Sequence, residues 1–163
     1  MDSTHVHLIL NHFPIVGTLI GTLFLLFGVW KKNNSIQQIS LATIFLMALF
    51  SIPVFLTGEP AEESVEKLPG VIKSLIEEHE EASQIAFWVM MVAGLFSLVG
   101  FAMQFMQNKM AKTFVMVTLL MSIITSGLMA RAGYLGGQIR HSEIRGNQTA
   151  VQNTEQGGEE DDD

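Results

Sequence analysis

The sequence predicts an all-α integral membrane protein: a four-helix up-and-down bundle with a short amphipathic helix in the linker of residues 58–81. Three observations predict this fold. Of the 163 residues, 48% are apolar and only 15% are charged. Four segments are each long and apolar enough to cross a bilayer, which takes about 20 mostly apolar residues. The connections alternate between short and long, which is typical of antiparallel neighbouring helices.

Composition also excludes several classes of function. The chain has no Cys, which excludes disulfides, iron–sulfur ligation, thiolate catalysis and c-type haem attachment. Its 16 acidic residues outnumber its 9 basic ones, and this argues against a nucleic-acid partner. No catalytic set of Ser, His and Asp is recognisable, so we expect an electron carrier or a subunit rather than an enzyme.

The first two spans are predicted at residues 8–30 and 36–57, joined by the short turn KKNNS. A cleaved signal peptide is the competing interpretation of the first span. It is disfavoured because Asp2 stands where a basic region is expected and no A-x-A-like site follows. The third and fourth spans are predicted at residues 82–106 and 113–132, again joined by a short turn. No repeat of 20 to 50 residues is visible.

The linker of residues 58–81 is acidic, and its apolar residues recur at helical spacing. We expect an amphipathic helix on the membrane surface there, broken into two pieces at Pro69-Gly70. Residues 1–145 then form the transmembrane domain. The tail of residues 146–163 ends in GGEEDDD, has no apolar periodicity and is predicted to be disordered.

Charge predicts the orientation. The two short turns contain four Lys and no carboxylate, which places them in the cytoplasm by the positive-inside rule. Both termini are then periplasmic, and the protein belongs in the bacterial inner membrane. Arg131, Arg140 and Arg145 lie on the opposite, outer side and need another explanation.

All five histidines fall on this outer side: His5, His7, His12, His79 and His141. A b-type haem would use several of them, because helical bundles hold cofactors between facing helices and imidazole is a common axial ligand of haem iron. Arg131 and Arg140 would then pair with the haem propionates. His7 and His12 point about 140° apart on an ideal helix, so one or two haems are expected.

Two other interpretations remain open. A Zn²⁺ or Cu²⁺ site would use three of the histidines with Glu62, Glu63 or Glu78. A structural subunit without a cofactor would use the histidines only to anchor helix ends in the headgroup region.

Three motifs carry a family resemblance: HLILNHFPIVG, LTGEPAEESVEKLPGV with EEHEEAS, and AGYLGGQIRHSEIR. Over residues 5–145 the chain resembles an uncharacterised bacterial membrane-protein family known as domain-of-unknown-function family 2231. The family pattern maps its histidines onto His7, His12, His79 and His141 and leaves His5 outside. The family has His-Pro at its first position, whereas here His7 is followed by Leu8.

The relatives are sometimes fused to Rieske-type or cytochrome-like modules, which implies a redox setting. We therefore expect a small b-type cytochrome-like electron-transfer protein, or a subunit of a respiratory complex. The metal ligands would be His7, His12, His79 and His141. Ligation by two histidines leaves iron no open position, which favours electron transfer. The expected partners are the lipid bilayer and a redox protein or larger membrane complex.

Overall fold

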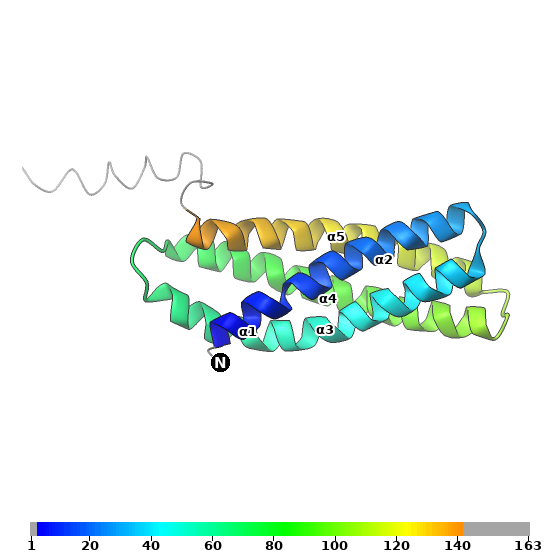
Figure 1. The fold of residues 1–163 in the computed structure, drawn as a ribbon, viewed down its shortest axis with the longest axis horizontal. Helices are drawn as coiled ribbons and strands as arrows, with labels where there is room; N and C mark the ends of the chain where they lie inside the picture. The colour runs from blue at the N-terminus through cyan, green and yellow to red at the C-terminus, as the bar shows by residue number, and fades with distance from the viewer. Residues whose placement is uncertain (1–2, 142–163) are drawn as a thin grey trace, which may run out of the picture.

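The computed structural model describes residues 3–141, which form five α-helices. They are α1 (Ser3–Leu10), α2 (His12–Trp30), α3 (Asn34–Glu66), α4 (Lys73–Phe105) and α5 (Ala111–Arg140). The helices run up and down in one elongated bundle, with α1 continuing into α2 (Figure 1). The tail predicted at residues 146–163 and the last residues of the predicted 1–145 domain lie outside the described residues.

The described residues contain four helical segments that are long and apolar enough to cross a membrane: His5–Trp30, Asn34–Glu66, Lys73–Phe105 and Ala111–Ile139. This confirms the predicted all-α membrane bundle. In the bundle, α2 packs against α3 and α5, and α4 packs against the same two helices. Helices α2 and α4 are therefore diagonally opposite, and α1 packs on α3.

The first span is interrupted at Asn11, which separates α1 from α2. Pro14 explains the interruption, because it has no N–H to donate to the carbonyl of Leu10 and its ring crowds that carbonyl. Asn11 itself keeps helical dihedral angles, and its N–H still donates to the carbonyl of His7 at 2.9 Å. The chain therefore bends here without leaving the helical path.

The linker differs from the prediction. Its two halves are helical and the break at Pro69-Gly70 is present, but there is no separate helix on the membrane surface. The halves instead extend α3 to Glu66 and start α4 at Lys73. A helix propagates easily once formed, and the Glu-rich stretch after Gly58 favours it. The predicted apolar stripe packs within the protein, where Leu75 and Ile76 form a small core with Ile139.

The last span also differs. We predicted that it ends at residue 132, but α5 continues to Arg140 through the glycine-rich segment of residues 133–137. Contacts with the extended start of α4 explain the difference, since Ala132 and Leu135 are buried with Ala82. Packing outweighs the weak helix propensity of glycine here.

Close packing holds the middle of the bundle together. The core contains fully buried residues of α2, α3 and α4, among them Leu25, Ile44 and Met90. Where α3 crosses α4, Gly94 lies against Ala48, and the hydroxyl of Ser97 donates to the carbonyl of Leu41 at 2.5 Å. Small residues let the two backbones approach closely, which is how helices associate in lipid.

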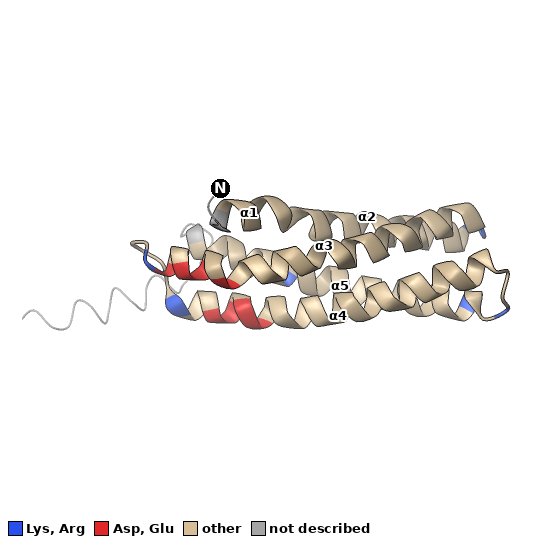
Figure 2. Cartoon of the chain, turned by 90° about the horizontal axis from the view of Figure 1, so that it is seen from below, with Lys and Arg blue, Asp and Glu red and all other residues tan. Residues whose placement is uncertain are grey.

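Charge is distributed unevenly along the bundle (Figure 2). The carboxylates of the described residues lie on α3 and α4 at the end where these helices are joined by residues 67–72. The two short turns, with Lys31, Lys32 and Lys109, lie at the other end. Among residues 3–141, the predicted segregation of acidic side chains from the short turns is therefore present.

The crossing of α3 and α4 predicts that Gly94→Ala is destabilising, by about 1–3 kcal/mol, because the new Cβ would overlap the Cβ of Ala48. Gly127→Ala is the matched control, since its Cβ would meet no atom within 4 Å. That control should be neutral or stabilising by up to about 1 kcal/mol. Unfolding of both variants in detergent by denaturant titration measures the difference. Equal stability of the two variants would contradict the close crossing.

Candidate histidine site at the acidic end

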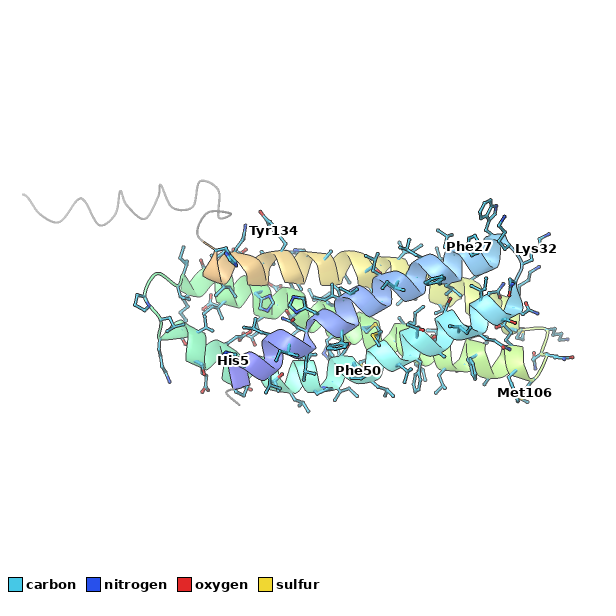
Figure 3. All side chains as sticks on the ribbon, viewed as in Figure 1. His5, Phe27, Lys32, Phe50, Met106 and Tyr134 are labelled. Carbon is cyan, nitrogen blue, oxygen red and sulfur yellow. The ribbon has the colours of Figure 1, made fainter. Side chains whose placement is uncertain are left out.

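The five histidines belong to helices or a helix end at the acidic side of the bundle. Figure 3 shows His5 in α1 at this end, and Tyr134 on α5 pointing away from the bundle. His5 is exposed, in keeping with its place outside the family pattern. His7 and His79 are half-buried, whereas His12 and His141 are exposed. The histidines therefore divide into an inner pair, His7 and His79, and three exposed residues.

His7 points from α1 toward α3. Its Nδ1 lies 3.1 Å from the carbonyl oxygen of Val54 and 3.3 Å from the hydroxyl of Thr57. Gly58 faces the ring: a Cβ there would lie 3.8 Å from Cε1 of His7. The ring is thus fixed between α1 and α3 by one backbone carbonyl and one hydroxyl.

His79 points from α4 toward α5. Its Nδ1 lies 2.9 Å from the carbonyl oxygen of Ala132. Its ring rests on Gly136, where a Cβ would lie 3.0 Å from Cε1 and 3.2 Å from Nδ1. The hydroxyl of Ser83 lies one turn away on the same helix, 3.4 Å from Nε2. His79 therefore faces inward, toward α5.

The carbonyl contacts define the protonation of both rings. A carbonyl oxygen only accepts hydrogen bonds, so a ring nitrogen at this distance from it must carry the proton. In neutral His7 and His79 the proton is then on Nδ1, and Nε2 keeps the lone pair. A hydrogen bond from Nδ1–H to a backbone carbonyl is the usual arrangement behind a histidine that binds metal through Nε2.

His12 has a different setting. Its Nδ1 lies 2.8 Å from the carbonyl oxygen of Leu8, on its own helical path at the bend before Pro14. The predicted divergence of His7 and His12 is consistent with this, because His7 contacts α3 and His12 is exposed. The hydrogen-bond partner of the His12 ring is therefore a carbonyl of the preceding helical turn, and not a group on a neighbouring helix.

The remaining predicted residues lie near the end of α5. His141 caps the helix and its N–H donates to the carbonyl of Gly137 at 3.0 Å; its side chain is exposed. Arg131 is exposed and immediately precedes Ala132, the residue that binds His79. Arg140 is the last residue of α5, and its side chain lies outside what the structure describes.

The carboxylates proposed for a zinc or copper site lie on α3 and α4. Glu62 is half-buried, and Glu63 and Glu78 are exposed. Within residues 3–141 no three side chains of His, Asp or Glu come together in a group that could hold a metal ion. An exposed ion pair between Lys73 and Glu66, at 3.4 Å, joins the two sides of the linker.

Several residues of the site were not predicted. The carbonyls of Val54 and Ala132 hold the two inner rings, and Thr57 and Ser83 supply hydroxyls. Backbone carbonyls leave no trace in a sequence. A signal was available in LTGE and YLGG, because a glycine beside the end of an apolar span marks a close approach to a backbone.

Fold and site together define a class: a helical membrane protein of four spans, with two half-buried imidazoles held by backbone carbonyls at its acidic end. Residues 4–148 match the family model described as "Predicted membrane protein (DUF2231)". The chain belongs to this family, as the sequence motifs indicated. No curated protein and no solved structure matches it.

We predict that nitrogen-15 NMR of the imidazoles finds the Nδ1–H tautomer in neutral His7 and His79. Gly136→Ala should shift the His79 signals and leave those of His7 unchanged, because the new Cβ would crowd only the His79 ring. Gly127→Ala, which adds a methyl group in open space on the same helix, serves as the control. An Nε2–H tautomer at His79 in the unmodified protein would contradict the carbonyl contact.

Proposed function

We propose that this protein is a b-type cytochrome-like electron-transfer protein, or a subunit of a membrane redox complex, with haem held by histidines at the acidic end of the bundle. The candidate ligands are His7, His12, His79 and His141. Bound haem would supply reversible one-electron transfer.

The observation that carries the proposal is the anchoring of the inner imidazoles. His7 and His79 each bind a carbonyl of a neighbouring helix through Nδ1, at 3.1 and 2.9 Å. Each neutral ring therefore keeps Nε2 as the atom that could coordinate iron. A carbonyl behind Nδ1 orients the ring and fixes the tautomer that a metal ligand needs.

The surroundings fit the same group. Glycines face both rings, so each imidazole packs directly against the backbone of the neighbouring helix. Arg131 is exposed on α5 next to the carbonyl that holds His79, where its guanidinium could pair with a propionate at the water interface. Arg140 is the second candidate for this role. Two imidazole ligands would leave no open position on iron, which favours electron transfer over oxygen chemistry.

A visible spectrum of the full chain, purified in detergent from a haem-replete host, tests the proposal. We expect a sharp reduced α-band that is lost or strongly weakened in His79→Ala. The control is His5→Ala, which removes an exposed histidine outside the family pattern and should keep the band. Circular dichroism of both variants checks that the helices remain.

The other two interpretations give different results in this experiment. Colourless protein that retains zinc or copper after dialysis would indicate a metal site of His and Glu in place of a haem site. Colourless protein without metal would indicate a structural subunit. Either result would end the cytochrome proposal.

We also propose that the chain lies in the bacterial inner membrane with both termini in the periplasm. The support is the placement of Lys31, Lys32 and Lys109 in short turns at one end, against the carboxylates at the other (Figure 2). Its partner would be a periplasmic redox protein or a quinol-oxidising complex.

Reporter fusions test the orientation. Alkaline phosphatase fused after Asp163 should be active, because it folds only in the periplasm, and the same reporter inserted after Lys32 should be inactive. The reverse pattern would invert the topology and place the histidines on the cytoplasmic side.

A further inference from the structure

The two halves of the bundle are built alike at their turns. Lys32 and Gln107 both adopt a φ of 52°. In both turns the next residue is Asn, and its N–H donates to a carbonyl five residues earlier at 2.9 Å, from Asn33 to Gly28 and from Asn108 to Met103. Each of these is a Schellman-type helix end. The hairpin of α1, α2 and α3 therefore turns in the same way as the hairpin of α4 and α5.

The histidine ends of the two hairpins are alike as well. In each, a histidine on the first helix binds a carbonyl of the second, Val54 for His7 and Ala132 for His79. In each, the residue four positions after that carbonyl is a glycine that faces the ring, Gly58 or Gly136. A missing Cβ on the following turn lets the imidazole lie close to the backbone of the neighbouring helix.

A third pair of residues supports the equivalence. Gly28 follows His7 at the same separation along the chain as Gly100 follows His79. Both glycines lie where the two helices of a hairpin approach each other: a Cβ at Gly28 would be 3.0 Å from the backbone nitrogen of Gln37, and one at Gly100 would be 3.4 Å from the Cβ of Phe114. The hairpins are thus two structural repeats.

The repeats pack so that α2 lies diagonally opposite α4, with α3 and α5 between them. His7, on the α1 extension of α2, and His79, on α4, are therefore equivalent residues on opposed helices at one end of the bundle. The two axial ligands of a haem approach from opposite faces of the macrocycle, so they must come from opposed elements of this kind.

Resting on the function proposed above, we infer that the chain binds a single haem between its two hairpins, with His7 and His79 as the two axial ligands. His12 has no equivalent in this arrangement. Its Nδ1 binds the carbonyl of Leu8 on its own helical path, and its ring is exposed. His141 is exposed at the end of α5, on the helix that carries the carbonyl for His79. Neither is a ligand in the inferred pair.

The test combines haem stoichiometry with ligand spectroscopy on the full chain. We expect one haem per chain and the electron paramagnetic resonance spectrum of bis-imidazole iron. His7→Met and His79→Met should each replace that signature with the one of mixed His and Met ligation, or with loss of haem. His5→Met is the matched control, because His5 is exposed and lies outside the family pattern, and it should leave the spectrum unchanged.

A second set of variants covers the case in which the Met variants do not fold. His7→Gly and His79→Gly, supplied with free imidazole, should regain the bis-imidazole spectrum, because imidazole enters the space of the missing ring. His5→Gly, the control, should show that spectrum without imidazole.

Two haems per chain, or a bis-imidazole signature that is lost in His12→Met and kept in His7→Met, would overturn the pairing while leaving the cytochrome proposal standing. Rescue that fails for both Gly variants in protein of native helicity would also overturn the pairing. Colourless unmodified protein would overturn the cytochrome proposal, and the pairing with it.

Discussion

Hydrogen-bonding groups inside a bilayer must find their partners within the protein, and most of this structure follows from that constraint. Buried hydroxyls of Thr22, Ser51 and Thr125 donate to the carbonyl four residues earlier on their own helix. Ser97 instead crosses from α4 to the carbonyl of Leu41 on α3. A hydroxyl that donates within its own helix needs no partner on a neighbouring helix. Glycine and alanine at the contact can then bring the two backbones together.

The same constraint explains how imidazoles are held at the end of the bundle. A half-buried ring needs a partner for its N–H, and in this part of the structure the nearest acceptors are helix carbonyls. Gly58 and Gly136 each lie one turn after the accepting carbonyl and face the ring. The tautomer of each inner histidine is defined by the backbone of its partner helix.

The sequence predicted correctly those features that depend on residues close together in the chain. Apolar length predicted the spans, and Pro69-Gly70 predicted the break in the linker. It was misleading at residues 58–81, where the Glu-rich stretch continues α3 beyond the predicted span. It was also misleading at residues 133–137, where contacts with α4 extend α5 through glycines of weak helix propensity. The carbonyls of Val54 and Ala132 could not be predicted, since every residue has one. The repeat of the two hairpins was not recognised in the sequence, because the hairpins share the geometry of their turns and the contacts of one histidine each.

The length of the helices explains how one end of the bundle can be both buried and close to water. Helix α4 has 33 residues, about 50 Å of helix against about 30 Å of hydrocarbon. If its apolar part, predicted at residues 82–106, fills the membrane, His79 lies one turn beyond it, where α5 still covers the ring through Ala132 and Gly136. Tyr134, exposed on α5, suits the same depth, since Tyr is enriched at membrane interfaces. In this placement, α3, α4 and α5 extend beyond the lipid and create a sheltered polar site. Helices only as long as the hydrocarbon layer is thick could not form such a site.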